Sequence, residues 1–290
     1  MLKPFVVRNL RIKSNLILAP MSEITDYPLR KIMLLNGADL VISGMVSSKS
    51  IFYRNKKSME MIRVRDTRPL CIQIFGGDVQ SMVYAACECE NQGADMIEIN
   101  AGCPVKKVVK AGAGISLMME PSRLAEIVYE IRKRVSIPVS VKIRAGINSY
   151  DECVSIGKIC EENGADVIHL HMRLPSQMHS GPVNLNSVRM LKKTLRIPVI
   201  ANGGIKNFED AKKVFAETGA DAISIAQGAI SNPFIFAEIK EYMENGKVKE
   251  RTVKEKVLLF IDYLKLSRDT YGERRAIVES RKLIGLWISG

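Results

Sequence analysis

Eight short runs of apolar residues recur along the chain, each six residues long. Most are continuously apolar rather than alternating, and this pattern is typical of strands that are buried on both faces of a parallel sheet. The pattern predicts eight strands, at residues 16–21, 40–45, 71–76, 96–101, 139–144, 167–172, 198–203 and 222–227.

Amphipathic segments with a helical period separate most of these runs. Four of them end at the same Gly-Ala-Asp joint, which begins at Gly37, Gly93, Gly164 and Gly219. A glycine just past a helix end adopts the left-handed conformation that stops the helix. Since parallel neighbours require crossover connections, the alternation predicts an α/β protein with the (β/α)8 TIM-barrel fold. The predicted helices are 79–92, 120–135, 150–163, 185–196 and 207–217.

Three stretches fall outside this alternation. The polar, basic segment 49–68 lacks a helical period, which predicts a long loop on the functional face of the barrel. Residues 232–245 predict a helix after the eighth strand, and residues 252–288 predict two more helices with a break at Gly272. We therefore expect a catalytic barrel domain at 1–245 and a short C-terminal helical extension at 246–290.

The composition is that of a globular protein with a large core, since 47% of the residues are hydrophobic. Six cysteines without paired spacing, and no charged-then-apolar leader, lead us to expect a reduced, cytoplasmic protein. No apolar run approaches the length of a membrane span, and neither the cysteines nor the three histidines have the spacing of metal ligands, so we expect no membrane and no metal. A net charge of +12 favours a polyanionic partner, although a generally basic proteome would explain it equally well.

Polar residues gather at the predicted carboxyl ends of the strands, where barrel enzymes place their catalytic groups. Lys142 stands in an otherwise apolar strand, so it either serves a site there or pairs with a carboxylate such as Glu98. Cys103, between Gly102 and Pro104, is placed to give or take a proton. The glycine-rich loops after the seventh and eighth strands favour a phosphate-bearing ligand over simple turns, because backbone amides can approach an anion there.

Seven segments, in order along the whole barrel, resemble the tRNA-dihydrouridine synthases, a family of FMN-dependent barrel enzymes that reduce uridine in tRNA. The segment around Cys103 is the most specific, because lysines followed by a Gly-Ala-Gly run are not general barrel features. The matching segments are LAPMSEITDYPLR (18–30), IQIFGG (72–77), INAGCPVKKVVKAGAGISLM (99–118), VSVKIRAG (139–146), HMRLPSQMHSG (171–181), VIANGGI (199–205) and GAISNPFIF (228–236).

The resemblance implies an FMN cofactor across the strand ends, NADPH as its reductant and tRNA as the substrate. Hydride would pass from the flavin N5 to C6 of a flipped uracil, and Cys103 would be the general acid that protonates C5 on the opposite face. The cofactor contacts that the resemblance implies are Pro20, Met21, Ser22, Gln73, Asn100, Lys142, His171, Asn202, Gly203, Gly204, Ala226 and Gln227. The residues expected on the substrate side are Asn100, Lys106, Lys107, Arg144 and Arg173.

The chain departs from the family pattern at two cofactor loops and in the tail. Residues 171–175 read His-Met-Arg-Leu-Pro where the family usually has His-Gly-Arg-Thr-Arg, and Ala226-Gln227 replaces a Gly-Arg pair, which removes a guanidinium from the phosphate side. The helical tail is also short. Two alternatives stay open: a flavin enzyme for a small pyrimidine-like substrate, similar to the dihydroorotate dehydrogenases, and an RNA-binding barrel that has lost its flavin. Basic residues clustered in the predicted rim loops favour the RNA enzyme, which we expect to be a monomer.

Overall fold

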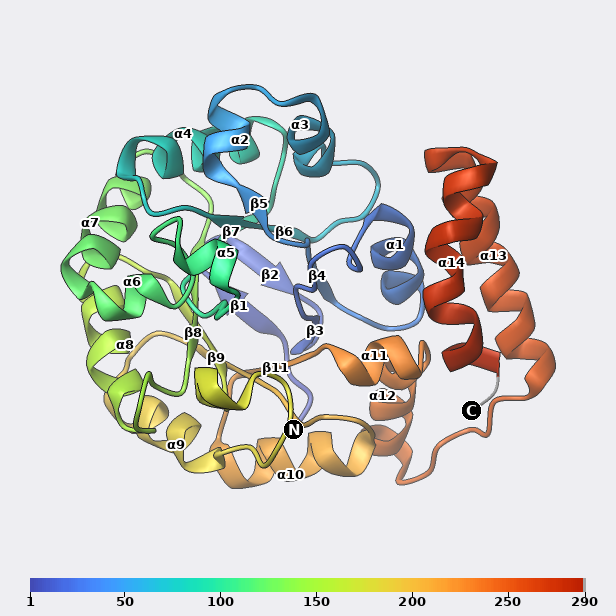
Figure 1. Cartoon of the computed structure of the whole chain (residues 1–290). Coiled ribbons are helices and arrows are strands. Elements are labelled where there is room, and N and C mark those ends of the chain that lie inside the picture. The colour runs from blue at the N-terminus through green and yellow to red at the C-terminus, as the bar shows by residue number, and fades with distance from the viewer. Residues whose placement is uncertain (289–290) are drawn as a thin grey trace.

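Eight parallel strands close into a barrel in the computed structural model, which describes residues 1–288 (Figure 1). Each strand pairs in parallel with its neighbours, and the pairing of β4 with β6 completes the ring. The TIM-barrel prediction and all eight predicted strand positions are thus confirmed. The barrel strands are β3 (Leu16–Leu18), β4 (Leu40–Ile42), β6 (Leu70–Phe75), β7 (Met96–Asn100), β8 (Val139–Arg144), β9 (Val167–His171), β10 (Val199–Asn202) and β11 (Ala222–Ile225).

A ring of helices covers the outside of the barrel (Figure 1). The predicted helices are confirmed, with ends that differ by a few residues. Gly37, Gly93, Gly164 and Gly219 all have positive φ angles, so the four Gly-Ala-Asp joints turn the chain as expected. The ring consists of α1 (Tyr27–Leu35), α4 (Val79–Asn91), α7 (Pro121–Arg132), α8 (Glu152–Glu162), α9 (Leu185–Thr194), α10 (Phe208–Thr218) and α12 (Ile235–Asn245).

The prediction of a long loop at 49–68 was wrong. The segment follows the two-residue strand β5 (Val46–Ser47) and contains most of α2 (Ser48–Phe52) and all of α3 (Lys56–Ile62). Side chains of Ser47 and Asn55 accept hydrogen bonds from the first turns of these helices, and Ile51 and Ile62 are fully buried. Helices of five and seven residues are too short to show a helical period in the sequence.

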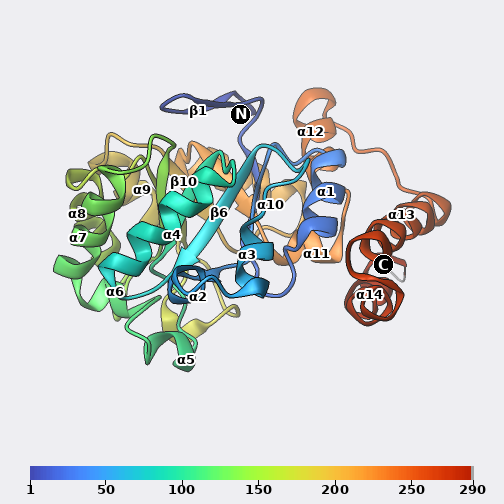
Figure 2. The ribbon, with the colours of Figure 1, turned by 90° about the horizontal axis from the view of Figure 1, so that it is seen from above.

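An N-terminal hairpin, which the sequence pattern did not reveal, covers the amino ends of the barrel strands. Its strands β1 (Phe5–Val7) and β2 (Leu10–Ile12) pair in the antiparallel sense. Phe5 and Ile12 are buried against barrel residues such as Ile17. Figure 2 shows this hairpin at one end of the barrel and α5 (Lys106–Val109) at the opposite end. The hairpin therefore closes one end and leaves the carboxyl ends of the strands as the open mouth.

The C-terminal extension is an antiparallel pair of helices, α13 (Val253–Tyr271) and α14 (Glu273–Ile288), packed beside α1 and α11 (Gln227–Ser231) (Figure 1). The break falls at Gly272, as predicted, and its φ is +82°. Trp287 packs edge-on against Phe260 and Tyr263 and donates a hydrogen bond of 2.8 Å to the carbonyl oxygen of Ile230. None of the helices within residues 1–288 is long and apolar enough to cross a membrane.

Candidate active site

A cavity of about 820 Å³ lies at the mouth of the barrel, within the size range of about 300–1,000 Å³ that is common for cofactor and ligand pockets. Its wall is built from the carboxyl ends of the strands and the loops that follow them. Fifteen residues predicted for the site line it: Pro20, Met21, Ser22, Gln73, Asn100, Cys103, Lys142, Arg144, His171, Arg173, Asn202, Gly203, Gly204, Ala226 and Gln227. Lys106 and Lys107 are exposed on α5 beside the mouth and are not part of the wall.

The loop after β7 holds Cys103 at the cavity wall. The Asn100 side-chain oxygen accepts hydrogen bonds from the backbone N–H groups of Gly102 at 3.2 Å and Cys103 at 3.0 Å. The chain then returns so closely that a Cβ at Gly114 would lie 2.4 Å from the carbonyl oxygen of Cys103. Gly114 also has a φ of +63°, so only glycine fits this approach without strain. The Gly-Ala-Gly run thus fixes the backbone that carries the thiol.

A continuous hydrogen-bond network crosses the barrel interior beneath the cavity. Gln73 accepts a bond of 2.9 Å from Asn100 and donates one of 2.7 Å to Glu98. The other carboxylate oxygen of Glu98 lies 2.7 Å from Nδ1 of His169 and accepts a bond from Ser140. Both polar ends of the Gln73 side chain are therefore engaged within the protein.

Lys142 continues the network on the other side of His169. Its ammonium lies 3.3 Å from His169 Nε2 and donates a bond of 3.0 Å to the side-chain oxygen of Asn202. Asn202 is oriented in turn by a bond of 2.9 Å to the carbonyl oxygen of Ser224. Lys142 therefore does not pair directly with Glu98, and the imidazole of His169 stands between the two charges.

Burial and neighbouring charges set the ionisation of this network. Burial lowers the pKa of Lys142 to about 8, with Glu98 opposing the shift and Arg144 adding to it. Burial would by itself raise the pKa of Glu98, but His169 and Lys142 hold it below its ordinary value. Burial and the Lys142 ammonium lower the pKa of His169. At neutral pH these shifts give a carboxylate, a neutral imidazole and an ammonium in one row.

The two predicted arginines are held by backbone carbonyls. Arg144 donates to the carbonyl oxygens of Gly102 at 3.0 Å, Leu174 at 3.0 Å and Met178 at 2.7 Å, and so joins the loops after β7 and β9. Arg173 donates twice to the carbonyl oxygen of Gly181. Their positions in the wall agree with the prediction, while direct contact with a substrate stays a prediction.

The wall near the loops after β9 and β10 offers acceptors and donors for an anionic or polar ligand. Nδ1 of His171 is buried and has no hydrogen-bond partner among residues 1–288. Burial, and then the cations Lys142 and Arg144, lower the pKa of His171, so its imidazole is neutral. A Cβ at Gly203 would lie 3.5 Å from the His171 ring, and the φ angle of Gly203 is +110°. This cradle of glycine backbone around an unpartnered imidazole nitrogen fits the polar tail of a cofactor.

Sequence reasoning missed several residues of the site. Lys206 and His179 line the cavity although neither was assigned to the cofactor or the substrate. Glu98 was considered only as a partner of Lys142, and His169 had no role. The sequence does carry a signal for this pair, because polar residues alternate along the predicted strands at Glu98 and Asn100 and again at His169 and His171. Such a period of two places all four side chains on the inner face of the barrel.

The fold and the site define a TIM-barrel enzyme with a cysteine, a lysine and a neutral histidine around one large cavity. The sequence profile of the family described as "Dihydrouridine synthase (Dus)" matches residues 17–289. The chain belongs to this family.

Curated relatives agree with this assignment. A "tRNA-dihydrouridine synthase B" of Vibrio parahaemolyticus is 35% identical over 285 residues, which cover 97% of this chain and 88% of the relative. A "Probable tRNA-dihydrouridine synthase" of Rickettsia conorii is 34% identical over 288 residues, which cover 98% of this chain and 87% of the relative. This chain therefore spans most of the length of both relatives.

Solved structures with low sequence identity share the fold. The structure of TcOYE with pHBA superposes with a TM-score of 0.64 at 11% identity and covers 87% of this chain and 95% of that chain. A 2-naphthoyl-CoA reductase complex gives a TM-score of 0.62 at 16% identity and covers 82% of this chain and 52% of that chain. At these identities the similarity supports the barrel fold alone.

Proposed function

We propose that this chain reduces uridine to 5,6-dihydrouridine in tRNA, with FMN as bound cofactor and NADPH as reductant. Membership of the dihydrouridine synthase family supports the reaction. The observation that carries the proposal is that one cavity brings Cys103, Lys142 and His171 together at the mouth of the barrel. These three residues come from three different strand ends.

The wall fits a flavin at several points. Lys142, Gln73 and Asn202 present polar groups from the strand ends, while Pro20 and Met21 supply an apolar surface. The unpartnered Nδ1 of His171 and the backbone of Gly203 and Gly204 would hold the phosphate end of FMN. When bound, FMN supplies the hydride that uridine reduction requires.

Cys103 is proposed as the general acid of the reaction. Cys103 belongs to the cavity wall, and the Asn100 bonds and the Gly114 contact fix its backbone. A thiol held in this way can deliver a proton to C5 of a uracil ring that enters the mouth. The base must first leave its stack, because a stacked uracil cannot reach a cavity inside a barrel.

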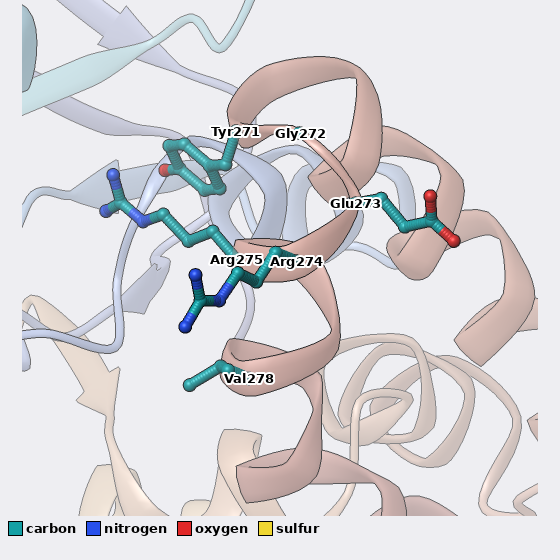
Figure 3. A pocket seen from close by; sticks show the side chains of 6 residues that line it. All are labelled: Tyr271, Gly272, Glu273, Arg274, Arg275 and Val278. Atoms are coloured by element: carbon teal, nitrogen blue, oxygen red, sulfur yellow. The ribbon is translucent and has the colours of Figure 1, made fainter.

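Exposed basic residues around the mouth would bind the RNA backbone. Lys106 and Lys107 lie on the α5 turn that follows Cys103. A second basic position is the turn between α13 and α14, where the Arg275 guanidinium lies 4.1 Å from the centre of the Tyr271 ring. Figure 3 shows Arg274 and Arg275 directed to the same side of this turn as Tyr271, with Glu273 directed away. We propose that both positions contact tRNA phosphates.

The experiment incubates the purified chain with NADPH and tRNA that lacks dihydrouridine, followed by nucleoside mass spectrometry. We expect a yellow protein that forms dihydrouridine. Cys103→Ala should retain the flavin and its reduction by NADPH but lose RNA turnover by a factor of about 10²–10⁴. Cys87→Ala, on the outer helix α4, is the matched control and should turn over normally.

Three results would contradict parts of this proposal. A colourless protein that binds tRNA would favour an RNA-binding barrel without flavin. Turnover of a small pyrimidine, without salt-sensitive tRNA binding, would favour the dihydroorotate dehydrogenase-like alternative. Full activity of Cys103→Ala would remove this residue from the mechanism.

A further inference from the structure

We propose that Glu98 and His169 form a buried relay. The Glu98 carboxylate compensates the positive charge of the Lys142 ammonium through the His169 imidazole, and the relay directs this ammonium toward the cavity. Glu98 and His169 do not line the cavity themselves and lie behind its wall residues. They act through Lys142, so both are positioning residues. The effect on a bound flavin rests on the proposed function, whereas the relay itself is a property of the polypeptide.

The geometry assigns the proton positions of the relay. Glu98 and His169 are both fully buried, and the carboxylate oxygen lies 2.7 Å from Nδ1. An ionised carboxylate only accepts hydrogen bonds, so Nδ1 carries the imidazole proton. Nε2 is then an acceptor, and it faces two donors, the Ser224 hydroxyl at 2.5 Å and the Lys142 ammonium at 3.3 Å.

Strand register makes this arrangement a consequence of barrel closure. Gln73 lies opposite Glu98 in the pairing of β6 with β7, and Lys142 lies opposite His169 in the pairing of β8 with β9. All four side chains face the barrel interior. Glu98 on β7 and His169 on β9 are 71 positions apart in the sequence, and their side chains meet across the intervening strand β8.

The charges around Lys142 explain why it needs this partner. Glu98 from β7 is the counter-charge, while Arg144 from its own strand is a nearby cation. The histidines that face it from β9 and the following loop are His169, His171 and His179, and burial lowers the pKa of each. A buried ammonium beside a second cation is costly unless an anion reaches it, and Glu98 reaches it only through His169.

The relay also determines where the ammonium points. Two of its three N–H groups are directed at His169 and Asn202. No third acceptor for it occurs among the described residues, and Lys142 lines the cavity. The remaining N–H is thus available to an electron-rich group in the cavity. Under the proposed function this group is the edge of the flavin ring.

The test uses the protein without flavin and without RNA. The chain has only three histidines, so a ¹⁵N-histidine-labelled sample gives few signals, which His171→Gln and His179→Gln assign. We expect His169 to be the neutral Nδ1–H tautomer at neutral pH. A doubly protonated His169 at neutral pH, or the Nε2–H tautomer, would overturn the proposal without any variant of the relay.

Glu98→Gln tests the coupling to Lys142. A glutamine can place its amide N–H toward Nδ1, which should switch His169 to the Nε2–H tautomer and turn a donor toward the ammonium. The titration midpoint of Lys142, followed with ¹³Cε-lysine and assigned by Lys142→Arg, should fall by one pH unit or more, so half-protonation should need at least a tenfold higher proton concentration. An unchanged midpoint and tautomer would overturn the proposal.

The matched control is Ser224→Ala, which removes the competing donor to Nε2 and leaves Glu98 and Lys142 in place. It should retain the Nδ1–H tautomer, and the Lys142 midpoint should not fall. If Glu98→Gln does not fold, His169→Asn retains a donor to Glu98 but loses the acceptor for Lys142, and the same fall is expected. In flavin-loaded protein, the pH dependence of the flavin midpoint potential should change in Glu98→Gln but not in Ser224→Ala.

Discussion

Gly114 shows how one position without a side chain fixes the candidate general acid. A Cβ there would lie 2.4 Å from the Cys103 carbonyl oxygen, at a φ of +63°. Gly114→Ala should therefore lower the free energy of unfolding by about 2 kcal/mol or more. The rate of RNA turnover should fall by a larger factor than the affinity for flavin. Gly219→Ala is the control, because it has a φ of +69° and no atom within 4 Å of its Cβ. The free energy of unfolding of Gly219→Ala, measured with urea, should fall by only about 1 kcal/mol. Equal losses would contradict the steric argument.

Lys142 should give the stability of the protein a distinct pH dependence. Its pKa is about 8 in the folded chain and 10.5 for an ordinary lysine side chain in water, so between these pH values the unfolded state binds more protons. The stability contribution of Lys142 therefore rises with pH across this window, by about 3 kcal/mol in total. Unfolding of the native protein and Lys142→Met at pH 7, 9 and 10 measures it. The amount by which the free energy of unfolding of Lys142→Met exceeds that of the native protein should shrink as the pH rises. A constant difference would contradict the prediction.

At the scale of elements, the strands and helices were predictable because their signals are local. Continuous apolar runs marked the buried strands, and Gly-Ala-Asp joints such as the one at Gly93 marked the helix ends. The segment 49–68 was misjudged because two very short helices replace the loop. The three-residue strands of the N-terminal hairpin carry too few residues for a period.

The candidate site was predictable only in part, for a physical reason. Cys103 and Lys142 stand out because each is a reactive residue in a glycine-rich or apolar setting. The link between Glu98 and His169 depends on strand register, which barrel closure determines and no local pattern encodes. The backbone bonds of Arg144 depend on loop conformations that follow from the same closure.

Trp287 is a buried residue through which helix α14 contacts the barrel. Its ring contacts Phe260 and Tyr263, and its N–H bonds to Ile230 at 2.8 Å. Trp287→Ala should free α14 from α11, with a local loss of about 3–5 kcal/mol. Hydrogen exchange should show faster exchange in α13 and α14 than in the barrel strands. Trp287→Phe retains a six-membered aromatic ring but loses part of the buried indole and its hydrogen bond, so its local loss should be smaller than that of Trp287→Ala. Uniform exchange changes across the barrel would contradict this attachment.

At the scale of the whole molecule, the two ends of the barrel have opposite characters. The hairpin residues Phe5, Val7 and Ile12 close the amino ends of the strands with apolar side chains. The carboxyl ends open into the cavity, and the exposed Lys106 and Lys107 lie beside it. A large ligand can therefore present a single base to the cavity from one side only.

This asymmetry predicts which part of the +12 net charge binds RNA. Neither Lys106 nor Lys107 has an acidic partner within 4 Å in the described part of the chain, so both are available to phosphates. Lys106→Ala with Lys107→Ala should weaken tRNA binding and reduce the slope of log affinity against log salt by about 1.4–1.8, the value for two lost phosphate contacts. Filter binding from 50 to 300 mM salt measures the slope.

The control for this slope is Lys133→Ala with Arg134→Ala, which removes the same charge from the carboxyl end of α7. These residues are exposed and lie at the amino ends of the strands, near Glu130. Long-range attraction depends on net charge, and both double variants change it equally. A loss of slope confined to the Lys106 and Lys107 variant therefore locates contacts at the mouth. Equal losses in both variants would mean that tRNA responds to total charge, and the proposed approach of RNA to the mouth would be wrong.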